Sequence, residues 1–108
     1  MSEINFNKFL GPGGLQAELI GSPLASGSII TPHRVVHEVS GTGTISTIVI
    51  PYEDFVGPLI LLAEDAWNWD ANGNIAAASG GDTVAGLAYV FIFNRARNKW
   101  YSILPTVV

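Results

Sequence analysis

The chain has 108 residues, of which 48% are hydrophobic and only 13% are charged, and its formal net charge at pH 7 is −4. This length fits one domain, the negative charge argues against the phosphate neutralisation that nucleic-acid binding requires, and the absence of cysteine excludes disulfides and thiolate sites within the chain. Because few charged residues are available to cover a monomer, we expect part of the apolar surface to be buried against other subunits.

Glycine and proline interrupt residues 1–28 every few positions, so no long regular element is expected there. Before and between these breaks lie short apolar groups that include Phe6, Phe9, Leu10 and Leu15. We predict an extended, Gly/Pro-rich N-terminal arm over residues 1–28, whose four apolar side chains contact a partner. The alternative is a covering loop that packs on its own domain.

The start of the chain lacks the basic residues and the continuous apolar run of a signal peptide, and no apolar run approaches the ~20 residues of a membrane span. We therefore expect a soluble protein that is made in the cytoplasm and has no membrane partner. No internal repeat is visible either, so we place one domain after the arm, over residues 29–108.

Residues typical of β-strands are frequent from Ser28 onward. Proline and glycine separate the apolar runs, and residues 70–73 have the composition of a tight turn. We predict strands at residues 29–39, 44–50, 59–63 and 74–79 and two more in a closing hairpin within residues 86–104. Strands spaced at roughly 8–12 residues indicate an all-β fold, and we predict a compact antiparallel β-sandwich or small barrel of about six to eight strands.

The closing hairpin is apolar on both of its faces. With a period of two, one face carries Leu87, Tyr89, Phe91 and Phe93 and the other carries Ala88, Val90 and Ile92. Both faces need cover, which predicts that the hairpin lies inside an assembly. Arg95 and Arg97 in its turn are candidate oligomer or partner contacts, with a solvated turn as the alternative.

Two groups of residues are candidates for metal binding. His33 and His37 are four residues apart, which on a strand is about 13 Å, whereas the ligands of one zinc ion lie about 2 Å from it. Residues 68–73 partly match a calcium loop, but Asn68 and Ser79 stand where aspartate and a bidentate glutamate are expected. We therefore predict no metal and no cofactor; histidines shared across an oligomer axis and a calcium loop are the alternatives.

The sequence contains no arrangement that demands catalysis. The acidic pairs Glu53-Asp54 and Glu64-Asp65 consist of neighbours, which on a strand point to opposite faces and form no ready acid and base couple. Serine, histidine and aspartate occur without a G-x-S-x-G motif or a phosphate-binding glycine motif. We predict that the chain is not an enzyme and has no catalytic residues.

The three tryptophans, Trp67, Trp69 and Trp100, are the remaining candidates for a site. Aromatic side chains concentrate in cores and subunit contacts, where they supply a large apolar area at low entropic cost. We predict that these indoles contribute to oligomer or partner contacts of the β-domain. A stacking platform for sugars is the alternative.

A series of short segments occurs in a characteristic order over about residues 41–104. The segments are GTGTISTIVIP at 41–51, GPLILLAEDAW at 57–67, GNIAAAS at 73–79, Gly86, FIFN at 91–94 and NKWY at 98–101. This order resembles a small β-domain of bacteriophage virion proteins, found at the C-terminus of fibres and spikes and in decoration proteins. The resemblance implies a structural, commonly trimeric module without catalytic residues. The basic turn at residues 94–98 departs from the simpler Asp-Gly type of turn in that pattern.

These observations lead to one functional expectation. We expect a non-enzymatic virion structural protein, a capsid decoration or cement protein located at the capsid surface. Its expected partners are further copies of itself, with a trimer favoured, and the major capsid protein or another virion protein. The alternative is a tail-fibre or spike tip that binds a host glycan through the three tryptophans.

Overall fold

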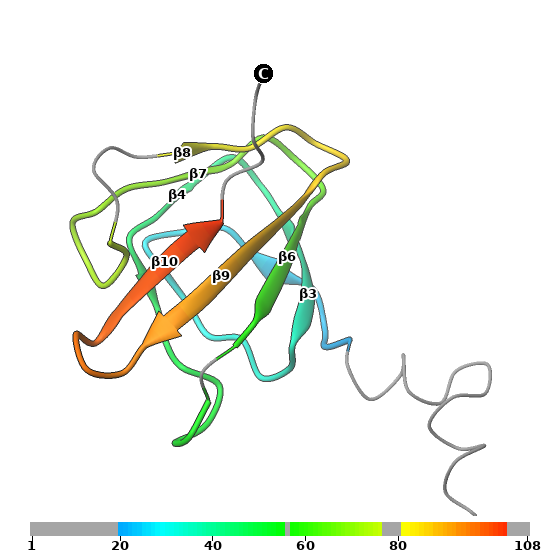
Figure 1. Cartoon of the computed structure of the whole chain (residues 1–108). Coiled ribbons are helices and arrows are strands. Elements are labelled where there is room, and N and C mark those ends of the chain that lie inside the picture. Colours follow the sequence, from blue (N-terminus) through cyan, green and yellow to red (C-terminus); the bar gives the residue numbers. More distant parts are fainter. Residues whose placement is uncertain (1–19, 56, 77–80, 104–108) are drawn as a thin grey trace, which may run out of the picture.

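The computed structural model describes residues 20–55, 57–76 and 81–103 of the chain (Figure 1). Within these residues the regular structure consists of β-strands without a helix, so the prediction of an all-β fold is confirmed. The described segments accordingly contain no helix that could cross a membrane. The strands are β1 (Leu24–Ala25), β2 (Ile29–Ile30), β3 (Val36–Ser40), β4 (Thr44–Ile45), β5 (Thr47–Ile48), β6 (Leu59–Ala63), β7 (Asn68–Trp69), β8 (Gly81–Asp82), β9 (Ala88–Asn94) and β10 (Lys99–Ile103).

The strands form one five-stranded sheet and two smaller ones. The main sheet has the order β1-β3-β6-β9-β10, and the others have the orders β2-β5 and β4-β7-β8. In the main sheet β1, β3 and β6 are parallel, whereas β6, β9 and β10 are antiparallel. The pairing is mixed, so the prediction of an antiparallel domain is wrong. The reason is that β4 and β5 pair in the small sheets, and the chain then returns to place β6 beside β3 in the same direction.

Two of the predicted strands are each divided in two, and β1, β7 and β8 form where no strand was predicted, so the described residues contain ten strands, more than the predicted six to eight. The segment 29–39 is broken around Pro32, which has no N–H to donate to a ladder. The segment 44–50 changes sheets at Ser46, because β4 pairs with β7 and β5 pairs with β2. At this break the N–H groups of Ser46 and Thr47 both donate to the carbonyl of Ser28, at 3.0 and 2.9 Å.

The predicted turns and the closing hairpin are largely confirmed. Residues 70–73 lie between β7 and Ile75, and the N–H of Asn72 donates to Oδ1 of Asp70 at 3.1 Å. The described part of the predicted strand 74–79 is reduced to a bridge between Ile75 and Trp100. Strands β9 and β10 form the predicted hairpin, with the turn at residues 95–98.

Of the predicted arm over residues 1–28 the structure describes residues 20–28, and part of these differs from the prediction. Ile20 bridges to Val36, the N–H of Gly21 donates to the carbonyl of Val36 at 2.8 Å, and β1 pairs with β3. Residues 20–25 therefore belong to the edge of the main sheet, not to an extended arm. The predicted arm contacts Phe6, Phe9, Leu10 and Leu15 lie outside the described residues.

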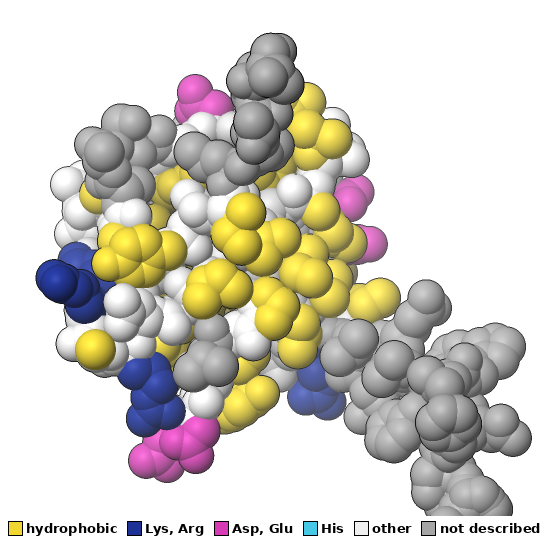
Figure 2. All heavy atoms as spheres, viewed as in Figure 1, with side chains coloured by type: hydrophobic (Ala, Val, Ile, Leu, Met, Phe, Trp, Pro, Cys, Tyr) yellow, Lys and Arg dark blue, Asp and Glu magenta, His cyan; other side chains and the backbone are white. Residues whose placement is uncertain are grey.

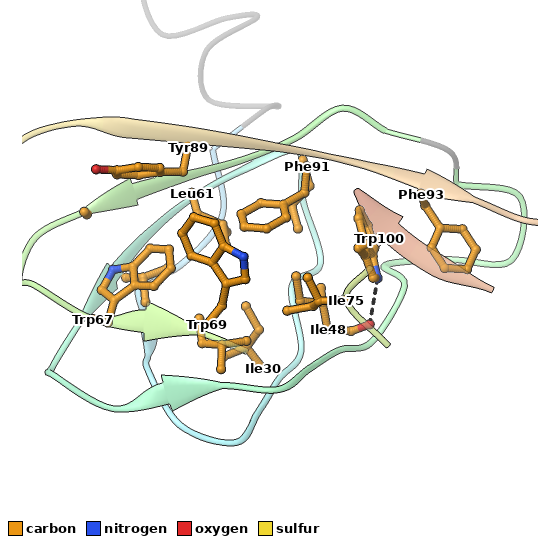
Figure 3. Close-up of a cluster of buried hydrophobic side chains, with 14 of the residues drawn as sticks. Ile30, Ile48, Leu61, Trp67, Trp69, Ile75, Tyr89, Phe91, Phe93 and Trp100 are labelled. Atoms are coloured by element: carbon orange, nitrogen blue, oxygen red, sulfur yellow. Dashed lines mark hydrogen bonds between the residues drawn. The ribbon is translucent and has the colours of Figure 1, made fainter. Parts of the chain in front are cut away.

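One hydrophobic core lies between the main sheet and the smaller sheets. Figure 3 shows aromatic and branched side chains gathered below β9, facing the strands of the small sheets. Alternation along β9 points Tyr89, Phe91 and Phe93 into this core, as predicted. Leu87 precedes the strand and is 49% exposed, so its assignment to the same face is wrong.

Candidate functional site

The outer face of the main sheet is apolar. Along β3, β6, β9 and β10 buried residues alternate with half-buried or exposed ones, and the second set points away from the core. We use the name outer face for the apolar members of that set, which are Val36, Ile60, Leu62, Ala88, Val90, Ile92, Tyr101 and Ile103. The hairpin is therefore apolar on both sides as predicted, and only its inner side is covered within the described chain.

The strand register joins these side chains into rows. Val36 pairs with Ile60, Ile60 pairs with Val90, and Val90 pairs with Ile103, so one row crosses four strands. Rows on either side pair Ile92 with Tyr101 and Leu62 with Ala88. Side chains that are directly opposite on adjacent strands lie within contact distance of each other. Residues from distant parts of the sequence thus form one continuous apolar surface.

Within the described residues this surface is partly exposed to solvent. Ile92, Tyr101 and Ile103 are 37%, 40% and 55% exposed, and Ile20, which bridges to Val36, extends the margin with 48% exposure. Figure 2 shows hydrophobic side chains gathered over the strands that Figure 1 labels β6 and β9. Single exposed apolar residues are common on proteins, but a contiguous patch marks an interaction surface.

Charged residues of opposite sign lie at diagonally opposite corners of the outer face. Glu38 is exposed on β3 and pairs with Leu62, and Glu64 follows β6 at the same end. Lys99 begins β10 on the other side of the sheet and pairs with Asn94 at the opposite end of β9, next to the turn that carries Arg97. The apolar surface therefore has an acidic corner and a basic corner, where Arg95 is paired with Asp54; Arg34 is exposed just before β3, at the same end of the sheet as the basic corner but on its other side.

The basic corner is hollowed on both sides of Tyr101. Two open depressions of about 600 and 590 Å³ share this residue. Arg95 lines the first, whereas Arg97 and Lys99 line the second. Nζ of Lys99 also donates to the carbonyl of Gly73 at 2.9 Å, which holds its positive charge at the rim.

The predicted contacts Arg95 and Arg97 are both exposed in the hairpin turn. Arg95 donates to Oδ1 of Asp54 at 3.1 Å, with both side chains largely in solvent, and such a pair contributes little stability. Oδ1 of Asn94 accepts the N–H of Ala96 at 3.0 Å and shapes the turn. Both arginines are accessible to a partner, and their role in partner contact stays a prediction.

The prediction that the tryptophans contact a partner is wrong. Trp67, Trp69 and Trp100 are only 1%, 3% and 0% exposed, so they contribute to the core of the domain itself. Nε1 of Trp100 donates to the carbonyl of Ile48 at 2.9 Å (Figure 3), whereas Nε1 of the other two has no hydrogen-bond partner in the described structure. The alternative of a sugar-stacking platform fails for the same reason. Trp67 precedes β7 and Trp69 lies in it, and only the tertiary fold shows that both side chains are buried.

The two histidines are closer than the strand spacing implied. His33 precedes β3, and its ring centroid is 4.6 Å from that of His37. His37 is fully buried; its Nε2 accepts the N–H groups of His33 and Arg34, both at 3.0 Å, and its Nδ1 lies 2.7 Å from the carbonyl of Ser22. This pattern assigns the proton to Nδ1, so both ring nitrogens of His37 are occupied. The ring therefore acts as a structural cross-link and offers no lone pair to a metal.

The environment of His37 also favours its neutral form. Burial lowers the pKa of His37 below its ordinary value, and the nearby His33 and Arg34 lower it further, against the raising effect of the hydrogen bond with Ser22. Protonation of Nε2 would replace two accepted hydrogen bonds with repulsion. The cross-link is therefore stable only while the ring is neutral.

Two acidic residues, Asp65 and Asp70, accept hydrogen bonds from backbone N–H groups in loops. The backbone N–H of Asn72 lowers the pKa of Asp70, with further contributions from the side chains of Ser46 and Asn72. Oδ2 of Asp65 accepts the N–H of Gly41 at 2.7 Å. Within the described residues, no group of three or more histidine, aspartate or glutamate side chains could hold a metal ion.

Comparison with known proteins identifies no family for this chain. No protein-family model and no curated protein matches it. A solved structure described as "Structure of a chaperone-substrate complex" is similar over 78% of this chain with 20% sequence identity and a TM-score of 0.46. The matched region is 14% of that other chain, so this chain spans a small part of its length.

Proposed function

We propose that this chain is a non-enzymatic structural protein of a bacteriophage virion, a capsid decoration or cement protein. The observation that carries the proposal is the outer face, a contiguous apolar surface that suits binding to another macromolecule. The order of short segments over residues 41–104, which resembles a virion β-domain, supports the choice of partner. The proposed partners are the major capsid protein and further copies of this chain at the capsid surface.

Binding is the whole of the proposed function. A protein that binds the assembled shell and not its dissociated subunits stabilises the shell by mass action. The arm contributes Phe6, Phe9, Leu10 and Leu15, which are buried on neighbouring shell subunits. The described residues supply the scaffold, which we take to be a β-sandwich of the main sheet on the smaller sheets.

The arm contacts can be tested in the full-length chain. We expect the double variant Phe6→Ala/Phe9→Ala to bind undecorated shells at least about 10-fold more weakly, since aromatic anchors dominate most interfaces. Co-sedimentation with shells of the phage that encodes the chain measures this binding. Ile29→Ala, which truncates an exposed side chain elsewhere, is the matched control. Equal binding by the double variant and the control would exclude the arm mechanism.

A further inference from the structure

We propose that the outer face binds a second copy of this chain, with the two main sheets packed face to face about a two-fold axis. The inner side of the main sheet is covered by the core, and its outer side carries apolar rows across four strands. Covering the exposed apolar side would remove its area from water, which favours association, and sheets pack face to face about 10 Å apart.

The charges around the outer face favour a second copy over an unrelated partner. A two-fold contact brings the same patch of both molecules together, so that residue i of one copy meets residue j of the other and the reverse. Consider a two-fold axis that runs between the two sheets, parallel to them and perpendicular to the line that joins the acidic corner to the basic corner. Rotation about this axis places the acidic corner of each copy against the basic corner of the other. The pair Glu38 and Arg97 then occurs twice. An unrelated partner would need the same diagonal arrangement of opposite charges that this chain already carries.

The hollow at the basic corner fits this arrangement. The depression of about 590 Å³ between Tyr101, Arg97 and Lys99 has a cationic rim and an aromatic wall. An acidic side chain that enters it meets two positive charges while its aliphatic part contacts the ring. In the two-fold pair that side chain is Glu38 of the other copy.

The size of the surface determines how tight the association is. Four strands about 4.8 Å apart and about five residues long, at 3.3 Å per residue, give a face of roughly 300 Å². Stable interfaces bury about 800 Å² on each partner, so the corners and the margin at Ile20 must contribute as well. The structure therefore predicts a weak pair that dissociates on dilution.

Sedimentation of the purified full-length chain tests the contact. We expect the average mass to rise from that of a monomer towards twice that value as the concentration increases from about 10 µM to about 1 mM. Ile92→Lys introduces a charge on an outward strand position, so the fold is retained and the association is weakened at least about 10-fold. Ile29→Lys, at a site on β2 that is 62% exposed, is the matched control and leaves the association unchanged.

A charge exchange tests the two-fold arrangement. Glu38→Arg alone and Arg97→Glu alone each place like charges together and weaken the association, whereas the double variant restores the pairing and the association. A monomer at every concentration, a trimer, or an association that Ile92→Lys leaves intact would overturn the proposal. The proposal would also be overturned if the double variant failed to restore the association. None of these measurements contains shells, so they test self-association through the outer face, whereas the shell binding of the proposed function is tested by the arm variants.

Discussion

Replacing the buried imidazole of His37 should lower the free energy of unfolding by about 3 kcal/mol. Alanine at this position leaves three backbone groups without their partner: the N–H groups of His33 and Arg34 and the carbonyl of Ser22. An unsatisfied buried group costs about 1–3 kcal/mol, and we take about 1 kcal/mol for each because these loops are near solvent. For a domain of this size, that total lowers Tm by roughly 10–20 °C.

The same cross-link predicts how stability depends on pH. The pKa of His37 in the folded protein lies below its ordinary value of 6.5, so the unfolded chain takes up the proton first as the pH falls. The stabilisation by neutral His37 is complete above the pKa that His37 has in the unfolded chain. It is lost as the pH falls from that value to the pKa in the folded protein. Below the folded pKa it does not decrease further. His37→Ala removes this dependence, and the difference in unfolding free energy between the two proteins shrinks as the pH decreases through this interval.

Urea unfolding followed by circular dichroism, at several pH values between about 4.5 and 7.5, measures both effects. His33→Ala is the control, because His33 is exposed and its Nε2 makes only long hydrogen bonds with Ser22, at 3.4 Å to the backbone N–H and 3.3 Å to the hydroxyl. We expect it to change stability by less than about 0.5 kcal/mol. A cost for His37→Ala below about 1 kcal/mol, or a difference from the wild type that stays constant with pH, would refute the role assigned to the imidazole.

Two further predictions concern close packing in the core. Gly21→Ala places a Cβ against the ring of His37 and should destabilise the fold by about 1–3 kcal/mol. In Gly27→Ala the added Cβ meets open space, so this control should change stability little. Thermal unfolding of both variants provides the comparison. Trp100→Phe removes the hydrogen bond from Nε1 to the carbonyl of Ile48, whereas Trp67→Phe removes no hydrogen bond. The free energy of unfolding, measured in urea, should therefore fall by about 1 kcal/mol more for Trp100→Phe than for Trp67→Phe. Equal losses in the two variants would contradict the assigned bond.

The closing hairpin shows how much local pattern predicts. Alternation in β9 identified Tyr89, Phe91 and Phe93 as one face, and that face is buried. The proline and glycine positions also located the turns well. Predictions about pairing were less successful, because β-branched residues favour strands without specifying a neighbour. The segment 44–50 looked like one strand, and only its two separate partners divide it at Ser46.

The candidate site was predicted with more error than the fold. The tryptophans were assigned to contacts with partners, although their size made them equally suited to the core, and burial in the domain decided between the two. The outer face is composed of residues from β3, β6, β9 and β10, and no single segment contains enough of it to be recognised. The predicted distance between His33 and His37 was wrong because the expected strand is interrupted around Pro32, so that His33 precedes β3 and only His37 lies in it.

The sequence by itself determined an all-β chain without cysteine, the apolar character of both sides of its closing hairpin, and the position of its basic turn. These properties depend on composition and on side-chain alternation, which act over a few residues. The tertiary structure decided that the sheets are mixed, that the three indoles are internal, that His37 joins β3 to two loops, and that an acidic and a basic corner flank one apolar face. Those features arise from contacts between segments distant in sequence, whose pairing depends on how the whole chain buries its apolar area.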